Sequence, residues 1–333
     1  MSFFAILFAL LIEQVRPLAP RNPVHAGLRG WTRWVARNLD AGRGHHGRIA
    51  WAASVVGPAV VAAGIHWLLM GLVGWLLAMA WSVAVLYFTL GFRQFSHHFT
   101  AIREALDAGD EARARELLAQ WQQVEATDLP RSELLRHVIE YSVLAAHRHV
   151  FGVLACFSIF AMLGLGPAGA VLYRMAEFTS RYWPRQALQH PVSAPLRETA
   201  ARAWHAIDWL PARLTAVAFA VVGNFEEAID CWRHHAQRFP NDNDGVVLAA
   251  TSGAVNVRLG GEALRSAFAT PGPGGWPEAG ATPQAEPASE DSESTPGREA
   301  EPAHLRSIVG LVWRSVVLWM LLLALLTLAR LLG

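Results

Sequence analysis

Long apolar segments alternate with polar, arginine-rich segments along this chain. Residues Ile49 to Met70 and Leu72 to Leu90 are each about twenty residues long and nearly free of charge, and a tight turn around Gly71 joins them. Ile308 to Leu328 has the same character. A helix of about 20 apolar residues is long enough to cross the hydrocarbon core of a bilayer. The pattern therefore predicts three such membrane spans.

The longest apolar feature is the stretch from Arg148 to Trp183, which turns back at Gly164-Leu165-Gly166-Pro167 and which we expect to form a central hairpin. Ionisable side chains are costly in lipid, so those on the returning limb should face protein, water or a ligand. Arg174 and Glu177 lie there one helical turn apart, and we take them as candidate substrate-binding residues. The alternative is an i,i+3 ion pair that only stabilises the helix.

Two segments near the N-terminus also follow a helical pattern. Phe3 to Ile12 is strongly apolar and is expected to be a short anchor. Val24 to Asn38 predicts an amphipathic helix with arginines on one face and apolar residues on the other. Such a helix lies on a membrane surface or packs on the bundle as a cytoplasmic helix. Its apolar face is Leu28, Trp31, Trp34, Val35 and Leu39, and its basic face is Arg29, Arg33 and Arg37.

The remaining segments are more polar. Phe92 to Ala146 is expected to form cytoplasmic helices, and Ile207 to Val222 a helix shorter and more amphipathic than a membrane span. Asn224 to Gly261 is expected to be helical at both ends, with Asn241-Asp242-Asn243-Asp244-Gly245 as a loop between them. Thr270 to Pro302 is rich in Pro, Gly, Ser, Ala and Glu, so we expect a disordered linker.

Composition supports a membrane protein. Hydrophobic residues make up 53% of the 333-residue chain and charged residues only 17%, unlike an average soluble domain. The net charge of +1 gives no case for a nucleic-acid partner. Arginines gather before Ile49 and after Phe92, on either side of two spans, so both loops can be cytoplasmic. We predict an all-α polytopic integral membrane helical bundle with amphipathic cytoplasmic helices, divided as 1–91, 92–147, 148–223, 224–269, 270–303 and 304–333.

The cysteines and histidines do not predict a metal site. Cys156 and Cys231 lie far apart and have no CxxC spacing, and the histidine pairs are adjacent or nearly so rather than at the i,i+4 spacing of helical ligands. The chain also lacks a P-loop, GxGxxG, GxSxG or HExxH motif. We therefore expect no resident metal and no conventional nucleotide-binding loop. The histidine pairs are His45-His46, His97-His98, His147 with His149, and His234-His235.

Four local patterns in the right order resemble the CobD/CbiB family of cobalamin-biosynthesis membrane proteins, which includes the AmpE branch. DWLPARLTA, Asp208 to Ala216, is the most specific match. GPAGAVLYR, Gly166 to Arg174, is similar to the family's turn between two helices. LDAGDEARARELL, Leu106 to Leu118, resembles its cytoplasmic helical pair, and SGAVNVRLGG, Ser252 to Gly261, resembles its segment ending in Arg-Leu-Gly-Gly. The resemblance covers most of the chain outside the expected linker.

The resemblance implies a multi-pass protein of the bacterial inner membrane that acts in cobalamin assembly. The family's synthase joins an aminopropanol phosphate to the propionate of adenosylcobyric acid, consuming ATP, with Mg²⁺ on the phosphates. A corrinoid substrate is therefore implied. The matching positions suggest that Arg174, Arg213 and Arg258 bind phosphate or propionate groups, with Glu177 and Asp208 beside them. Each arginine has the alternative of a membrane-interface or helix-cap role.

Departures from the family pattern leave a second function open. Where the family typically has Glu-Asn-Thr-Val-Asp-Gly, this chain has His147-Arg148-His149-Val150-Phe151-Gly152, so two acidic positions are lost. Asn22-Pro23-Val24 stands where His-Pro-Val is usual. AmpE-type relatives, which resemble signalling or sensor proteins of cell-wall stress, also lack the carboxylates. The alternative is therefore a non-catalytic membrane sensor or signalling modulator.

Overall fold

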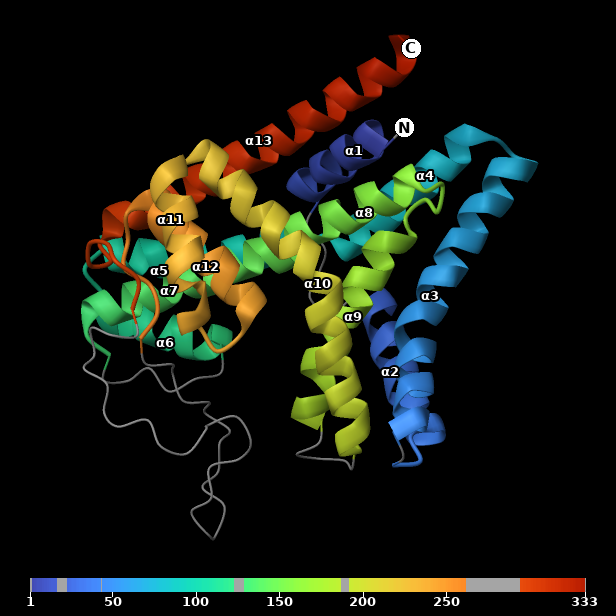
Figure 1. Ribbon diagram of the computed structural model, residues 1–333, viewed down its shortest axis with the longest axis horizontal. Coiled ribbons are helices and arrows are strands. Elements are labelled where there is room, and N and C mark those ends of the chain that lie inside the picture. The colour runs from blue at the N-terminus through green and yellow to red at the C-terminus, as the bar shows by residue number, and fades with distance from the viewer. Residues whose placement is uncertain are drawn as a thin grey trace. The chain divides into compact units, whose positions relative to one another are not determined.

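The structure is a computed structural model of the chain, and it describes residues 2–16, 23–42, 44–122, 129–186, 192–261 and 294–332. Helices account for most of these residues, with no named β-strand among them and only two isolated β-bridges. The chain forms two compact units (Figure 1). Unit 1 is Met1–Gln94, Ala145–Thr215 and Val316–Gly333, and unit 2 is Phe95–Leu144 and Ala216–Ser315.

Four helical stretches have the length and composition to cross a membrane, which confirms the predicted all-α membrane bundle. Their outer surfaces carry many exposed apolar side chains, such as Val60, Val61 and Leu68 on one of them, and such a surface is stable only against lipid or another apolar partner. Two further apolar helices, α1 (Ser2–Val15) and α4 (Trp75–Thr89), are shorter. The four stretches are His45–Leu72, Arg131–Met162, Ala194–Val222 and Pro302–Ala329.

Two predicted span boundaries are wrong. The expected span from Leu72 to Leu90 contains only α4, whose 15 residues are about 22 Å long, short of the roughly 30 Å hydrocarbon core. Conversely, the expected short helix from Ile207 to Val222 is the second half of α10 (Ala194–Val222), a 29-residue helix about 43 Å long. The helix continues through Pro211 without a break. Span length along this chain therefore does not follow the boundaries of the charge-free runs.

The central hairpin is present, but its first limb begins earlier than expected. Helix α7 (Arg131–Ala146) continues through the π-helical turn η1 (His147–Phe151) into α8 (Gly152–Met162), and α9 (Ala168–Gln186) returns. Gly164 and Gly166 in the turn have φ values of 77° and 58°, which favour glycine. A Cβ on Gly169 would lie 2.1 Å from the Cys156 carbonyl oxygen, so α8 and α9 approach closely at that point.

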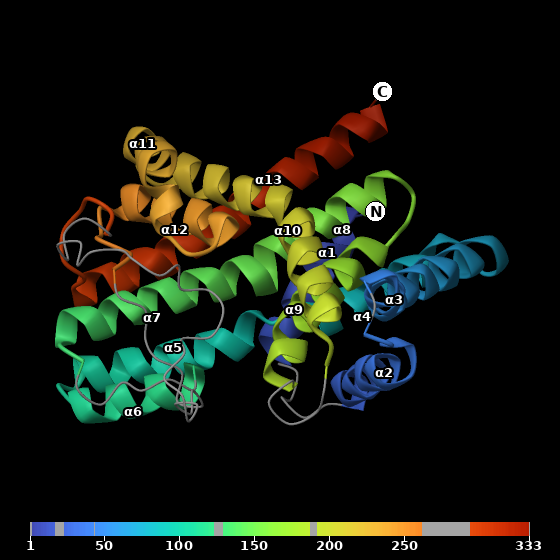
Figure 2. The ribbon, with the colours of Figure 1, turned by 60° about the horizontal axis from the view of Figure 1, so that its bottom comes forward.

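The basic amphipathic helix is α2 (Pro23–Leu39), and it packs on unit 1 beside α3 (Gly44–Leu72) (Figure 2). Val35 is fully buried in a cluster with Ala50, Trp183, Leu196 and others, so the helix is anchored to α3, α9 and α10. Trp31 and Trp34 of the expected apolar face remain exposed. Packing on the bundle is therefore one role of this helix, and its exposed tryptophans suit a membrane interface as well.

Unit 2 contains shorter helices. They are α5 (Phe92–Asp107), α6 (Glu111–Gln122), α11 (Phe225–His235), η2 (Ala236–Arg238) and α12 (Asp242–Val255), together with most of α7 and the first half of α13 (Pro302–Leu332). The expected loop at Asn241–Gly245 is instead the start of α12, because the Asn241 side chain caps the helix by accepting from the Asn243 N–H. A Cβ on Gly253 would lie 2.1 Å from the Glu227 carbonyl oxygen, so α11 and α12 also approach closely.

Part of the expected linker is ordered. Residues 270–293 lie outside the described residues, but Ser294 and Arg298 form bridges with Gly260 and Val257. The Thr295 N–H donates to the Leu259 carbonyl at 2.7 Å. The expectation of disorder as far as Pro302 is therefore wrong for Ser294 to Arg298, which pair with the Arg-Leu-Gly-Gly segment and the residues before it.

Candidate functional site

The most specific sequence motif places Asp208 in a buried polar network of unit 1. Asp208 lies on α10 and has no exposed surface. Its Oδ1 accepts a hydrogen bond from the Tyr173 hydroxyl at 2.7 Å and contacts His147 Nε2 at 3.0 Å. The other ring nitrogen of His147 lies 2.9 Å from the Thr215 hydroxyl. The network thus ties η1, α9 and α10 together through one carboxylate.

The local backbone explains how these side chains meet. His147 begins the π-helical turn, which inserts an extra residue into the helix and reorients the side chains that follow; such turns are frequent at functional sites. Gly152 directly follows the turn, and a Cβ on it would lie 2.1 Å from the Tyr173 ring and hydroxyl. A glycine is therefore required there for Tyr173 to reach Asp208. The second carboxylate oxygen, Oδ2, is buried and has no hydrogen-bond partner among the described residues.

The two candidate residues of the hairpin form an ion pair, and Arg181 extends it. Arg174 Nη1 lies 3.1 Å from Glu177, and Arg181 Nε lies 3.2 Å from the other oxygen of the same carboxylate. Glu177 is buried, whereas Arg181 is 41% exposed. One carboxylate is therefore shared by two guanidinium groups, which leaves the row Arg174–Glu177–Arg181 with a net positive charge. The predicted helix-stabilising pair exists, and Arg174 directly follows Tyr173 of the buried network.

The structure does not gather all the predicted site residues. Arg213 lies over the Trp209 ring at 4.1 Å from its centroid and donates to the Trp209 carbonyl at 2.8 Å, so it interacts along its own helix. Arg258 belongs to unit 2, whereas Arg174, Glu177, Asp208 and Arg213 belong to unit 1. The backbone N–H of Arg258 donates to the Arg298 carbonyl at 2.7 Å, which fixes the start of its loop.

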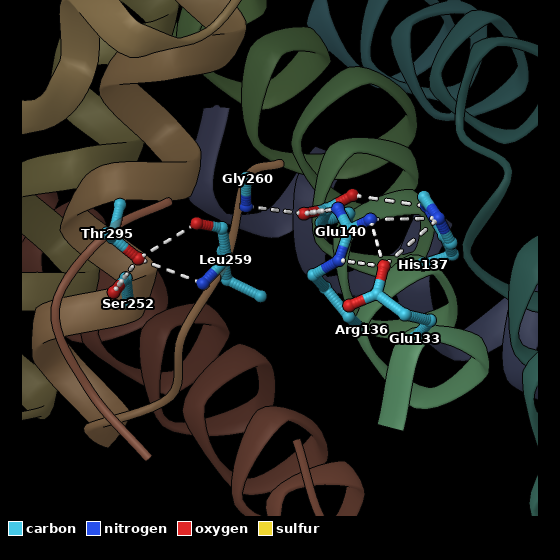
Figure 3. Close-up of polar contacts among 8 residues, drawn as sticks. All are labelled: Glu133, Arg136, His137, Glu140, Ser252, Leu259, Gly260 and Thr295. Carbon is cyan, nitrogen blue, oxygen red and sulfur yellow. Dashed lines mark hydrogen bonds and ion pairs between the residues drawn. The ribbon is translucent and has the colours of Figure 1, made fainter. Parts of the chain in front are cut away.

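A charged cluster on α7 holds the loop that carries Arg258 (Figure 3). Glu140 accepts a hydrogen bond from the Gly260 N–H at 2.7 Å and pairs with Arg136 at 3.0 Å. Arg136, only 6% exposed, also pairs with Glu133, and His137 lies 3.5 Å from Glu140. The carboxylates thus satisfy a buried guanidinium and a loop amide together.

The other side of this loop is held by hydroxyl groups. The Thr295 hydroxyl accepts hydrogen bonds from the Leu259 N–H at 2.9 Å and from the Ser252 hydroxyl at 2.7 Å (Figure 3). All three residues are buried. Together with Glu140, these contacts fix the Arg-Leu-Gly-Gly segment from both sides, and Gly260 and Gly261 adopt φ values of 89° and 102°.

Sequence reasoning missed several residues of these sites. Tyr173 lies within the quoted segment Gly166 to Arg174 and His147 begins the quoted segment His147 to Gly152, but their pairing with Asp208 joins positions 35 and 61 residues apart. The replacement of the family's glutamate by His147 is the one signal that points to this position. Glu140 and Arg136 gave no signal, because charges spaced i,i+4 on a polar helix are common on solvated surfaces.

Comparison with known proteins identifies the family. The family model described as CobD/Cbib protein matches residues 3–274. "Cobalamin biosynthesis protein CobD" of Stutzerimonas stutzeri (strain A1501) is 30% identical over 288 residues, which cover 86% of this chain and 84% of that protein.

Two further relatives carry the same name but match a smaller share of the chain. The protein of Chromobacterium violaceum is 33% identical over 181 residues, which are 54% of this chain and 55% of that protein. The protein of Leptospira interrogans serovar copenhageni is 25% identical over 197 residues, 58% of this chain and 60% of that protein. No solved structure matches the chain. From the family match and the relative from Stutzerimonas, the chain belongs to the CobD/Cbib family of cobalamin-biosynthesis proteins.

Proposed function

We propose that this chain is a multi-pass protein of the bacterial inner membrane that carries out the amide-forming step of the synthase reaction. In that reaction the amine of an aminopropanol phosphate is joined to the propionate carboxyl of adenosylcobyric acid, and ATP is consumed. The coupling needs an activated carboxylate, a deprotonated amine and cations around phosphate. The family and the names of the relatives support a role in cobalamin biosynthesis.

One observation carries the proposal. Asp208 of the most specific motif is the shared acceptor of a fully buried network that holds α9 at Tyr173, and the next residue on α9 is Arg174. A buried carboxylate is costly unless it is paired and hydrogen-bonded. A buried hydrogen-bonded network that adjoins the charged residues of α9 is typical of residues that position functional side chains.

The residues would divide the chemistry as follows. Arg174 would bind a phosphate or propionate oxygen, for which a guanidinium offers bidentate geometry. Asp208 would act from within the protein, because it is fully buried and holds Tyr173, the neighbour of Arg174, in place. His147 and Tyr173 would act through Asp208 by fixing its position.

The described residues do not fit a protein-held Mg²⁺ site. Glu177 is already paired with two arginines and one oxygen of Asp208 with His147 and Tyr173. Mg²⁺ prefers several oxygen ligands in octahedral geometry, and among the described residues no group of three or more His, Cys, Asp or Glu residues is placed to hold a metal. These residues therefore hold no metal in the proposed reaction, and ATP enters as a co-substrate.

The experiment is reconstitution with a genetic test. Purified protein in nanodiscs, given adenosylcobyric acid, aminopropanol phosphate, ATP and MgCl₂, should form adenosylcobinamide phosphate and consume ATP. Deletion of the gene should impose a corrinoid requirement that the wild-type gene relieves and the Asp208→Ala gene does not. Absence of product, together with a deletion strain that needs no corrinoid, would overturn the proposal.

A second candidate is favoured by the acidic positions that this chain lacks. His147 and Phe151 stand where the family pattern has carboxylates, so a non-catalytic, AmpE-like sensor or signalling modulator is the alternative. It predicts that deletion changes the response to cell-wall stress and leaves corrinoid synthesis intact. The deletion strain therefore discriminates the two functions in one comparison.

A further inference from the structure

Helix α2 presents three different faces. Thr32 and Val35 are buried against unit 1. Trp31 and Trp34 stack on each other with centroids 5.4 Å apart and are exposed, 39% and 53%. The third face is a stripe of three arginines at i,i+4,i+8 spacing, Arg29, Arg33 and Arg37. The helix contains no acidic residue.

The arginine stripe of α2 lies beside the charged row of α9. Arg33 Nε donates to the Tyr182 hydroxyl at 3.3 Å, which joins the two helices directly. Tyr182 follows Arg181 in the row, and its ring stacks on Phe178 at 4.9 Å between centroids. The guanidinium of Arg33 is therefore held at the end of α9 that carries Arg181.

His25, near the start of α2, lies beside the end of α4. Its Nε2 lies 3.2 Å from the Phe88 carbonyl oxygen of α4. Burial lowers the pKa of His25, and the positive charges of Arg174 and Arg29 lower it further against the opposing effect of the Phe88 carbonyl. Arg29 and Arg174 thus act on the same ring from α2 and α9.

The surroundings add to the positive charge. Unit 1 contains 16 arginines and 5 acidic residues, a formal charge of +11, whereas unit 2 contains 12 arginines and 22 acidic residues, a charge of −10. The near-neutral total hides this difference. Of the five acidic residues in unit 1, Asp208 and Glu177 are buried and paired, and Asp40 bonds Ser193. Negative ligands are therefore attracted to unit 1.

We propose that Arg29 and Arg33 of α2 and Arg174 and Arg181 of α9 form a binding site for a phosphate group. Arg33 bonds Tyr182 of α9, Arg174 and Arg181 share the carboxylate of Glu177, and Arg29 lies one turn before Arg33 on the arginine stripe of α2. Guanidinium donors match phosphate oxygens in bidentate geometry. A singly charged carboxylate would neutralise less of this charge than a phosphate does, so phosphate is the favoured chemistry. The phosphate belongs to a soluble phosphate compound or to the headgroup of an anionic lipid.

The first arm tests soluble phosphate. The full chain is placed in phosphatidylcholine nanodiscs, and binding of inorganic pyrophosphate is measured by calorimetry at about 0.15 M salt, where the Debye length is about 8 Å. Arg29→Gln and Arg174→Gln should each weaken binding about tenfold or more, since each removes charge-assisted hydrogen bonds. Arg37→Gln is the matched control, because it removes the same charge from the same stripe eight residues from Arg29, and it should change binding less than about twofold.

The second arm tests the lipid headgroup. Nanodiscs containing phosphatidylglycerol are analysed by native mass spectrometry for lipids retained on the protein. If the wild type and Arg37→Gln retain phosphatidylglycerol but Arg29→Gln and Arg174→Gln do not, the result supports the site and identifies its ligand as a lipid phosphate. Pyrophosphate binding with the same pattern supports it with a soluble phosphate. The site is overturned if both arms fail to distinguish Arg29→Gln and Arg174→Gln from Arg37→Gln, or if neither probe binds the folded wild type.

Identification of this site with the substrate's phosphate rests on the proposed function, but the binding measurements do not. A protein that binds pyrophosphate at these arginines and forms no adenosylcobinamide phosphate would refute the coupling reaction and leave the site standing. A protein that forms the product while Arg29→Gln and Arg174→Gln bind pyrophosphate normally would refute the site alone.

Discussion

Gly152→Ala is the sharpest test of the buried network, because it adds one methyl group at the end of the π-helical turn. A Cβ there would lie 2.1 Å from Tyr173 Cζ and from its hydroxyl oxygen, and 2.6 Å from Cε1. Tyr173 is fully buried and its ring packs on Trp204 at 5.1 Å between centroids. The ring therefore has little room to give way, and its hydroxyl has to leave Asp208.

The expected cost follows from two effects. Overpacking a well-packed site costs about 1–3 kcal/mol. Loss of a hydrogen bond to a charged acceptor costs about 1.5–3 kcal/mol in soluble proteins, and hydrogen bonds between membrane helices are often weaker, about 1 kcal/mol. We therefore expect Gly152→Ala to lower the free energy of unfolding by about 2–5 kcal/mol, which corresponds to a fall in Tm of roughly 5–15 °C.

Buried cysteines make the assay straightforward. Cys156 and Cys231 are both free and buried, so a thiol-reactive fluorescent dye reports unfolding as temperature rises. The matched control is Gly57→Ala, since a Cβ on Gly57 meets nothing within 4 Å. Alanine is favoured over glycine in a helix by about 0.5–1 kcal/mol, so this variant should melt at or slightly above the wild-type temperature.

A second background isolates the cause. In a Tyr173→Leu protein the ring that Gly152→Ala would strike is gone, so adding Gly152→Ala should lower Tm by less than about 3 °C further. If Gly152→Ala melts like Gly57→Ala, or loses as much in the Tyr173→Leu background as in the wild type, then the close approach of Gly152 to Tyr173 is wrong.

Three further outcomes follow from the described contacts. Asp208→Asn should be more stable than Asp208→Ala, by about 1–3 kcal/mol in the free energy of unfolding, because the amide oxygen still accepts from the buried donors. Equal melting temperatures would show that the acceptor is unimportant. Glu140→Gln should speed amide hydrogen exchange at Gly260 by about tenfold, since a charge-assisted bond is about twice as strong as a neutral one, whereas Glu133→Gln, which leaves the Gly260 bond in place, should not. Because the pKa of His25 is lowered in the folded chain, the unfolded chain binds a proton there more readily as pH falls below 6.5. The wild type should therefore lose stability in that range more steeply than His25→Gln, which a measurement of Tm against pH would check.

The parts of the fold that could be predicted are those set by local pattern. A charge-free run near Ile308 and the glycine turn at Gly164 and Gly166 each determine an element without help from distant residues. The basic amphipathic helix belongs to the same class, since its period of 3.6 is visible in 15 residues. Fold class and family followed from these features and from four short motifs.

Boundaries that depend on context could not be predicted. An aspartate and a proline are typical of a helix start and favour a helix that begins near Asp208, yet α10 begins at Ala194 and continues through Pro211 into an apolar half. Pro211 removes one backbone donor from the helix, and the helix continues despite that loss. Asn241–Gly245 was read as a loop because of its turn residues, but residues of that kind also begin helices.

The site was predictable only in part for a related reason. Arg174 and Glu177 were found because charge is rare on an apolar limb, and Asp208 because it belongs to a motif. Their partners were not, since the π-helical turn shifts the side chains after Ala146 away from regular helical spacing. The link between His147 and Asp208 spans 61 residues and leaves no local trace.

The substitution at position 147 changes what Asp208 requires of its surroundings. A glutamate at this position, as in the family pattern, would place a second carboxylate beside Asp208, and two carboxylates at such a distance cannot both stay ionised without a proton or a cation between them. His147 instead places a ring nitrogen 3.0 Å from Asp208 Oδ1, so no second negative charge faces that carboxylate. The network then serves to position α9, because its two side-chain bonds to Asp208 reach η1 and Tyr173, which adjoins Arg174. In this chain Asp208 would therefore hold α9 in place without a cation between two carboxylates.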